Sequence, residues 1–321
     1  MSASAGFTDQ NVVPYGLLVM YAMDCHRDGT CPPNATKPLA PPPSGVILGF
    51  IVGSDTVDPR HPAYAPGPIQ LLAQLTCYGV VVQRPNNEVV VAIRGTDGIA
   101  EWIEDAEFVF KPYAPTLPLP AGTTARVEQG FWGIYASLNY VDLQGVVIGP
   151  AAATIATLYK GASSIVVSGH SLGGPLATYL ALDLARVDTR QTIRGCYFAS
   201  PHPGDDAFAA FFQETIGNYV VYNYVMDVVP RMPPTNIGYT SLANRRVITP
   251  ALAKAEVTLG LGCNHHIVCY LAMLDYPQTL AALNPVPAAE INSWSCVRGP
   301  GVGRDSLAAM LFDRVAEVAT A

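Results

Sequence analysis

The second half of the chain contains a block of regularly alternating strand-like and helix-like segments, which constrains the fold more than any other feature. In chain order these segments are 164–167 (strand), 172–187 (helix), 194–199 (strand), 206–214 (helix) and 219–225 (strand). Strands that alternate with helices form βαβ units, in which the strands run parallel and the helices cover the sheet. The block therefore predicts an α/β fold with a mainly parallel central sheet and helices on both faces.

Weaker patterns predict the remaining elements. Helical periodicity occurs at 11–25, 98–110 and 304–319 and in most of 130–160, a strand is expected at 46–52 and a β-hairpin at 78–94, and Pro-rich loops at 30–45 and 112–122. The 321 residues suit one large α/β unit, and 50% of them are hydrophobic, which is ample for a buried core. We therefore expect a single domain over residues 1–321.

Charge and hydropathy exclude several classes of protein. The formal net charge is -7, and no run of basic residues is longer than Arg245-Arg246, so we expect no nucleic-acid partner. No stretch reaches 18 apolar residues, which argues against a transmembrane helix. Residues 1–10 lack the basic and apolar regions of a signal peptide. This pattern fits a cytoplasmic protein, or a secreted one whose leader is absent from this sequence.

The seven cysteines do not have the spacing of a zinc site, and we expect neither a metal nor another cofactor. Cys25 and Cys31 flank a polar loop, so a disulfide between them is one possible way to close it. Cys77 and Cys196 lie in apolar stretches and are expected to be buried free thiols.

The segment Gly169-His170-Ser171-Leu172-Gly173 is the strongest chemical motif. It joins the apolar strand at 164–167 to the helix at 172–187, which is the strand–turn–helix of a nucleophile elbow. The sharp turn requires small residues two positions before and after the serine, and Gly169 and Gly173 meet this requirement. The helix N-terminus favours the negative charge that develops there. Ser171 is therefore the predicted nucleophile.

A serine nucleophile needs a base, and the base needs a carboxylate that orients it. In α/β-hydrolases the chain order is serine, acid, histidine, with the acid on the loop after a strand. Asp227 follows the strand at 219–225 directly and is the predicted acid. The base must then be His265 or His266, which cannot both point at one place. Asn264 is expected to cap a helix that begins here, which favours His265.

Six segments together resemble the class 3 lipases, the family of fungal triacylglycerol lipases with bacterial and plant relatives. They are VVVAIRGT (89–96), VEQGFWGIY (127–135), IVVSGHSLGGPLA (165–177), YFASPHPGDDAFAAFF (197–212), YNYVMDVVPRMPP (222–234) and NHHIVCYL (264–271). The resemblance runs from about residue 75 to 275. It implies a core at about 46–276, preceded by a helix and Pro-rich loop (1–45) and followed by a C-terminal extension (277–321).

The resemblance also assigns roles to residues. The last segment is similar to the pattern N-H-x-x-x-x-Y-L of some relatives, which selects His265. The family's oxyanion hole implies the backbone N–H of Leu172 and the N–H and hydroxyl of Thr96. Glu128 stands where histidine is usual, and Pro175 stands where alanine is common.

The segment 98–110 occupies the position of the family's lid. Trp102, Ile103, Ala106 and Val109 form an apolar stripe opposite four acidic residues. We expect Trp102 to face lipid when the lid opens at an oil–water interface, although an ordinary surface helix has the same pattern.

By this resemblance the protein is expected to be a carboxylic ester hydrolase, foremost a triacylglycerol lipase that forms an acyl-enzyme intermediate. The alternatives are a phospholipase A1, a soluble-ester carboxylesterase of the feruloyl type, and a non-catalytic lipid-binding relative. Such a non-catalytic relative usually lacks one member of the triad, whereas all three positions are filled here.

Overall fold

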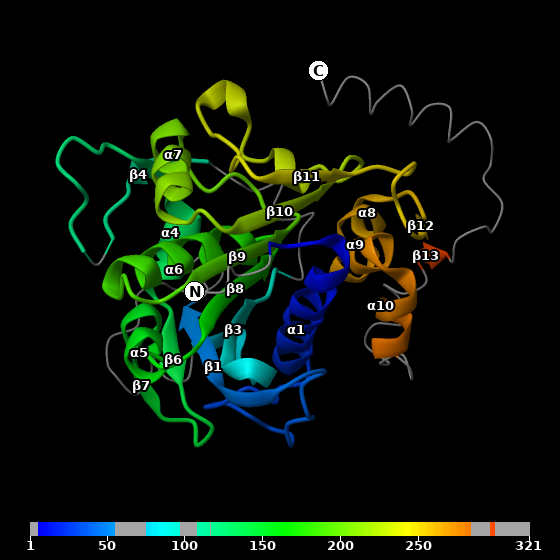
Figure 1. The fold of residues 1–321 in the computed structure, drawn as a ribbon, viewed down its shortest axis with the longest axis horizontal. Coiled ribbons are helices and arrows are strands. Elements are labelled where there is room, and N and C mark those ends of the chain that lie inside the picture. Colours follow the sequence, from blue (N-terminus) through cyan, green and yellow to red (C-terminus); the bar gives the residue numbers. More distant parts are fainter. Residues whose placement is uncertain (1–5, 55–74, 97–107, 116, 284–295, 299–321) are drawn as a thin grey trace.

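The computed structural model describes residues 6–54, 75–96, 108–115, 117–283 and 296–298. Within these ranges a nine-stranded sheet forms the centre of the molecule (Figure 1). Its spatial order is β11 (Arg245–Ile248), β10 (Tyr219–Tyr224), β9 (Ile193–Phe198), β8 (Ser164–His170), β3 (Glu88–Ile93), β2 (Leu75–Arg84), β1 (Val46–Ser54), β6 (Asn139–Val141) and β7 (Val147–Pro150).

The sheet is parallel in one half and antiparallel in the other. Strands β3, β8, β9, β10 and β11 pair in parallel, as the alternating block predicted. Strands β3, β2, β1, β6 and β7 pair antiparallel, because short turns such as Pro85–Asn87 connect some of them directly. The parallel half carries the elbow, so the carboxyl ends of β3, β8 and β10 lie along one edge.

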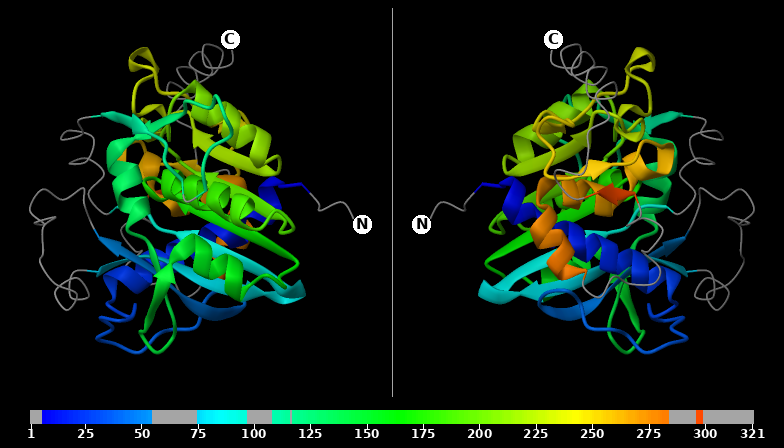
Figure 2. Two further views of the ribbon diagram at one scale, coloured as in Figure 1. Left: turned by 90° about the vertical axis from the view of Figure 1, so that its left-hand side faces the viewer. Right: turned by 90° about the vertical axis from the view of Figure 1, so that its right-hand side faces the viewer.

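Helices cover both faces of the sheet, which the two views of Figure 2 show edge-on. On one face lie α1 (Asp9–Arg27), α9 (Ile267–Leu274) and α10 (Tyr276–Ala282), and on the other α4 (Gln129–Ala136), α5 (Ala151–Leu158), α6 (Gly173–Val187) and α7 (Asp206–Thr215). The side chains of β3 alternate between the two faces: Val90 and Ala92 pack with α1, whereas Val89 and Val91 pack with α6. A strand buried on both faces therefore has a continuous apolar sequence.

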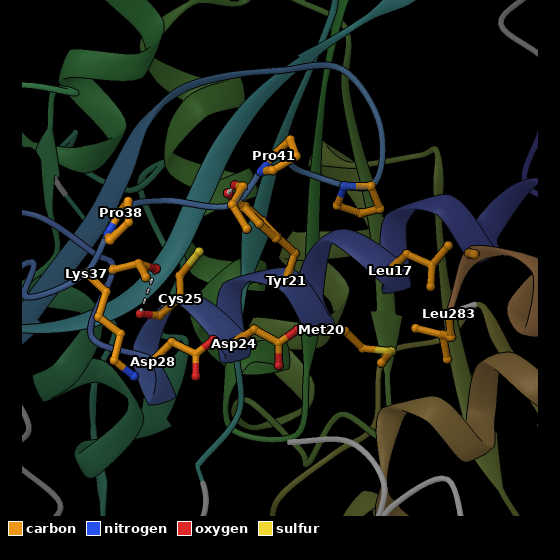
Figure 3. Close-up of a pocket in the computed structure, with 14 residues that line it drawn as sticks. Leu17, Met20, Tyr21, Asp24, Cys25, Asp28, Lys37, Pro38, Pro41 and Leu283 are labelled. Carbon is orange, nitrogen blue, oxygen red and sulfur yellow. Dashed lines mark hydrogen bonds between the residues drawn. The ribbon is translucent and has the colours of Figure 1, made fainter. Parts of the chain in front are cut away.

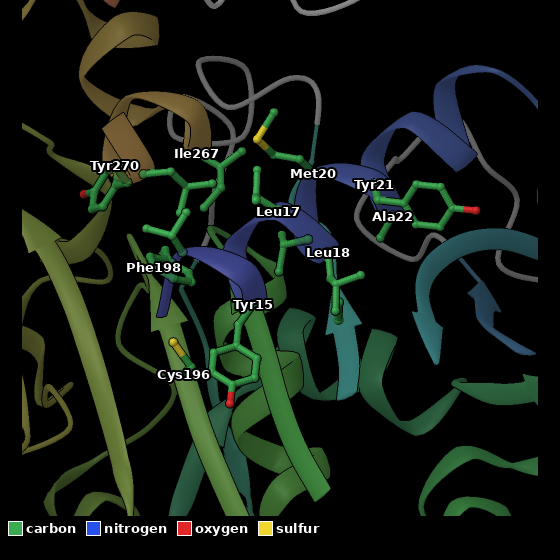
Figure 4. Close-up of a cluster of buried hydrophobic side chains, with 14 of the residues drawn as sticks. Tyr15, Leu17, Leu18, Met20, Tyr21, Ala22, Cys196, Phe198, Ile267 and Tyr270 are labelled. Atoms are coloured by element: carbon green, nitrogen blue, oxygen red, sulfur yellow. The ribbon is translucent and has the colours of Figure 1, made fainter. Parts of the chain in front are cut away.

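Helix α1 is part of the main core. Thr8 caps its N-terminus in a capping box with Asn11. Figure 4 shows its apolar side chains against Ile267 and Tyr270 of α9 and against Cys196 and Phe198 of β9. In the described part of the chain, no helix has both the length and the apolarity needed to cross a membrane.

The remaining elements are short. Helix α8 (Leu261–His265) precedes α9, β4 (Phe110–Pro112) pairs with β5 (Arg126–Glu128), and β12 (Glu256–Val257) pairs with β13 (Val297–Arg298). The expectation of a mostly helical 130–160 is wrong for its middle part, because β6 and β7 extend the sheet there as a hairpin. The helix expected at 304–319 lies outside the described residues.

Two disulfides differ from the expected cysteine pattern. Cys31 is bonded to Cys77 and Cys263 to Cys296, whereas Cys25 is a buried free thiol. The Cys25–Cys31 bridge and the free Cys77 were therefore wrong, because folding brings β2 beside the loop that follows α1. Cys196 is buried and free, as predicted.

A groove of about 620 Å³ lies beside α1, between this helix, the Pro-rich loop and the end of α10 (Figure 3). Leu17, Met20 and Leu283 contribute to its apolar walls. None of the residues predicted for catalysis lines this groove, so it is separate from the candidate site.

Candidate active site

Ser171 lies at the sharp turn between β8 and α6 in a strained backbone conformation. Its φ is +55°, in the left-handed region that residues with a side chain rarely adopt. A Cβ on Gly169 would lie 2.1 Å from the carbonyl oxygen of Gly173, and one on Gly173 would lie 2.4 Å from that of Ile93. Both glycines are therefore required by close backbone contacts, as the elbow motif predicted.

The helix after the elbow begins two residues after the serine. Leu172 directly precedes Gly173, the first residue of α6, so its N–H is among the amides that a helix start leaves without an intrahelical acceptor. Pro175 lies in the first turn, where the missing N–H disturbs no helical hydrogen bond. The start of α6 thus directs amide dipoles towards Ser171.

The carboxyl end of β3 brings the R-G-T segment against the elbow. Ile93 of β3 pairs with Gly169 of β8, and a Cβ on Gly95 would lie 2.9 Å from Cβ of Ser171. Thr96, which follows at once, is partly buried. The structure therefore brings Thr96 and Leu172 to the same small region as the serine.

Arg94 holds this strand end in place. Its buried guanidinium donates to the carbonyl oxygens of Cys77 at 2.5 Å and of Gly95 at 2.6 Å, and it lies over the ring of Tyr78. These bonds constrain the main chain immediately before Thr96. Sequence analysis gave Arg94 no role of its own, because its partners lie on a neighbouring strand.

Asp227 and His265 form a buried hydrogen-bonded pair. Nδ1 of His265 lies 2.7 Å from Oδ2 of Asp227, whose side chain is fully buried. The main-chain N–H of Val229 donates to Oδ1 at 3.0 Å. The carboxylate accepts the hydrogen that Nδ1 carries. In the neutral ring Nε2 therefore carries no hydrogen and is the nitrogen that can take up a proton.

Tyr270 completes the bonding of the carboxylate. Its hydroxyl donates to Oδ2 of Asp227 at 2.8 Å and accepts the N–H of Tyr224 at 2.9 Å. Burial and the nearby Asp227 raise the pKa of Tyr270 well above its ordinary value, so the phenol stays a donor. The sequence pattern contained this tyrosine, but its contact with Asp227 became visible only in three dimensions.

The two adjacent histidines point in different directions. His265 ends α8, and His266 has the extended backbone (φ -58°, ψ 134°) that separates α8 from α9. A Cβ on Gly262 would lie 3.5 Å from Nε2 of His266, so this ring folds back on α8. Burial, with the neighbouring His265, lowers the pKa of His266. The geometry therefore pairs His265, and not His266, with Asp227.

Asn264 has a different role from the predicted helix cap. Its Nδ2 donates to the carbonyl oxygen of Met226 at 3.1 Å, whereas α8 already begins three residues earlier at Leu261. The cap was wrong because α8 precedes the histidines and does not start at them. Asn264 instead ties the segment of the predicted base to the loop of the predicted acid.

The hydroxyl of Ser171 and Nε2 of His265 are both buried, and neither has a hydrogen-bond partner among the described residues. These two atoms therefore remain available to form hydrogen bonds with a substrate. Catalytic hydrogen bonds often form only when substrate is bound.

Two expectations for the neighbourhood have separate outcomes. Trp102 and most of the predicted lid lie outside the described residues; Val109 is described, and it precedes β4 and is 46% exposed. Glu128, at the position where the family usually has histidine, caps α4 by accepting the N–H of Phe131 at 2.7 Å. Burial raises the pKa of Glu128, whereas its hydrogen bonds with backbone N–H groups act in the opposite direction.

Comparison with known proteins finds the family that the sequence motifs resemble. Residues 90–237 match the family model described as Lipase (class 3). Phospholipase A1-II 7 from Oryza sativa subsp. indica is 31% identical over 207 residues, which are 57% of this chain and 50% of the relative. A lipase from Rhizomucor miehei is 28% identical over 209 residues, 61% of this chain and 53% of that protein. The chain thus spans about half the length of these relatives.

A solved structure shows the same fold. The Rhizomucor miehei triacylglyceride lipase superposes with a TM-score of 0.52 at 21% sequence identity, over 76% of this chain and 82% of that one. This likeness, together with the mixed sheet and its helices, establishes the α/β-hydrolase fold that the sequence predicted. Residues 90–237 thus match the class 3 lipases in sequence, and the described residues share the fold of a solved lipase.

Proposed function

We propose that the protein is a serine hydrolase that cleaves carboxylic esters of lipids, with triacylglycerols as its foremost substrates. The observation that carries the proposal is the buried His265–Asp227 pair, because the ring of His265 lies 4.7 Å from that of His170, the residue before the strained Ser171. Strain of this kind is kept where function requires it. The match of residues 90–237 to the class 3 lipase model supports the same reaction class.

In the proposed reaction, Nε2 of His265 removes the hydroxyl proton of Ser171 as Oγ forms a bond to the ester carbonyl carbon. The N–H of Leu172 and the N–H and hydroxyl of Thr96 stabilise the resulting oxyanion. The tetrahedral intermediate collapses, the alcohol leaves with the proton from His265, and an acyl-enzyme remains. Water then attacks the acyl group by the same route, and the carboxylic acid is released.

We also infer that residues 1–321 act as one domain. Helix α1 supports this, because its buried face packs on β2, β3 and α9 within the same core as the site. The N-terminal helix is therefore proposed to be part of the hydrolase core.

A phospholipase A1 is the second candidate, and the rice relative's name favours it. A soluble-ester carboxylesterase is the third. Initial rates on tributyrin emulsions, phosphatidylcholine vesicles and methyl ferulate separate the three. We expect the highest rate on tributyrin, rising when its concentration passes the solubility limit. A highest rate on phosphatidylcholine would assign the phospholipase instead.

The amphipathic pattern of 98–110 alone supports a role for Trp102 at an oil–water interface. Trp102→Ala is expected to reduce the rise in rate above the solubility limit and to leave hydrolysis of dissolved p-nitrophenyl acetate unchanged. Equal rate-against-concentration curves for both proteins would refute this role.

The catalytic proposal itself is tested by Ser171→Ala. Hydrolysis should fall at least about 10³-fold, since the base then has no nucleophile to activate. Labelling by a fluorophosphonate probe should disappear as well. Ser168→Ala is the matched control, because Ser168 is a buried serine of β8, the strand that leads to Ser171. Activity of Ser171→Ala within tenfold of wild type would overturn the proposal.

A further inference from the structure

His170 is a buried imidazole next to Ser171 whose bonds reach the segment of the proposed base. It is the last residue of β8 and is 6% exposed. Its Nε2 lies 2.7 Å from the main-chain carbonyl oxygen of His265, a residue 95 positions away in the chain. A carbonyl oxygen only accepts hydrogen bonds, so Nε2 of His170 carries the hydrogen.

This bond satisfies a specific requirement of the fold. His265 is the last residue of α8, and its carbonyl is one of those that a helix end leaves without an intrahelical donor. The extended His266 ends the helix, so the donor has to come from elsewhere. His170 supplies it from the end of β8, and thereby joins the base's main chain to the strand that carries the serine.

The two rings also touch. The centroids of the His170 and His265 imidazoles are 4.7 Å apart, with 36° between the ring planes. On its other side His170 adjoins the strand end at the proposed oxyanion hole, since a Cβ on Gly95 would lie 3.3 Å from its Nδ1. His170 therefore lies between the proposed base and the proposed oxyanion hole.

We propose that His170 is a positioning residue, which fixes the main chain and the ring of His265 at a set position relative to Ser171. This inference rests on the proposed function. Asp227 anchors the imidazole of His265 through Nδ1, and Asn264 anchors the helix to Met226, but neither bond connects His265 to β8. The bond from His170 makes that connection.

The neighbours of His170 favour its neutral form. Burial first, and then the nearby His265 and His266, lower the pKa of His170 well below its ordinary value of 6.5. The ring of Tyr270 lies 6.3 Å away. A neutral neighbour suits a base that becomes an imidazolium during the reaction, because a second positive charge beside it would oppose proton uptake.

Two substitutions separate the hydrogen bond from mere packing. His170→Gln retains an N–H donor at a similar reach, whereas His170→Leu retains bulk without a donor. We expect His170→Leu to lower kcat for p-nitrophenyl butyrate about 10- to 100-fold with KM changed less than about threefold, because a base misplaced by about 1 Å costs about 10²-fold. His170→Gln should restore kcat to within about threefold of wild type.

His202→Leu is the matched control. His202 is also buried, and its Nδ1 lies 2.7 Å from the carbonyl oxygen of Pro233, away from the pair of Asp227 and His265. The two leucine variants should lose similar thermal stability, but only His170→Leu should lose kcat at a temperature where both are folded. Equal kcat in the two variants would overturn the positioning role.

The pH profile is a further test. With His170 neutral, the acid limb of log(kcat/KM) against pH should have a slope of about one, as for a single ionising group. A slope approaching two would show that His170 gains its proton in the same range, and would overturn the inference. A wild-type protein without esterase activity or fluorophosphonate labelling would instead overturn the proposed function. Full activity of wild type and of His170→Leu would overturn the role of His170 alone.

Discussion

Tyr270→Phe removes one hydroxyl from the buried carboxylate of Asp227 and leaves the shape of the side chain unchanged. The lost hydroxyl donates to Oδ2 of Asp227 at 2.8 Å and accepts the N–H of Tyr224 at 2.9 Å. Asp227 then keeps two donors, the imidazole of His265 on Oδ2 and the N–H of Val229 on Oδ1. The substitution therefore weakens the pair without breaking it.

The structure sets the size of the effect. A hydrogen bond to a charged group contributes about 1.5–3 kcal/mol, and a buried N–H left without an acceptor costs about 1–3 kcal/mol. Tyr270 is fully buried, so water does not simply replace its hydroxyl. Since the two effects overlap, we expect the free energy of unfolding to fall by roughly 2–4 kcal/mol, which lowers Tm by roughly 3–6 °C for a chain of 321 residues. The kcat should fall about tenfold, because the oxygen that orients His265 loses its second donor.

Thermal unfolding by circular dichroism measures the first effect, and kcat for p-nitrophenyl butyrate well below Tm measures the second. Tyr224→Phe is the matched control. Only the main-chain N–H of Tyr224 bonds to the hydroxyl of Tyr270, so removing the hydroxyl of Tyr224 leaves the bonds around Asp227 in place. A Tm within about 1 °C of wild type together with a kcat within twofold would refute the reasoning.

Three further predictions concern the base, the disulfide beside it and the buried histidines. His265→Ala should lower kcat at least about 10³-fold and His266→Ala less than about tenfold; a reversal in steady-state assays would move the base by one residue. Cys296→Ser opens the bridge to Cys263, which closes 33 residues and anchors α8, so the free energy of unfolding should fall by about 4 kcal/mol in urea titrations; an unchanged midpoint would contradict this. Burial lowers the pKa of His170, His202 and His266. The unfolded chain therefore binds these protons more tightly, and stability should fall as pH drops below about 6.5, by up to about 1.4 kcal/mol per pH unit for each histidine; urea midpoints that stay constant from about pH 7.5 to 5 would contradict it.

Local steric requirements made much of the site predictable from the amino-acid order. The elbow depends on Gly169 and Gly173 two residues from Ser171, so its pattern is contained in five consecutive residues. Asp227 was predictable because a loop after a parallel strand directs its side chains to the carboxyl edge of the sheet. The hairpin at 78–94 was predictable from its β-branched runs and its turn residues.

Other features arise only from contacts between segments far apart in the chain. The bridge of Cys31 to Cys77, the hydroxyl of Tyr270 on Asp227 and the bond from His170 to His265 join residues 46, 43 and 95 positions apart. No local pattern encodes such pairs, because the packing of α1, α8 and α9 against the sheet decides which side chains meet. For the same reason the chain order alone could not choose between the neighbours His265 and His266. The end of α8 directs the ring of His265 towards Asp227. The sequence by itself thus determined the fold class and pointed to the elbow and to Asp227 as the predicted acid, whereas the tertiary structure decided which histidine contacts Asp227 and which partners hold that histidine.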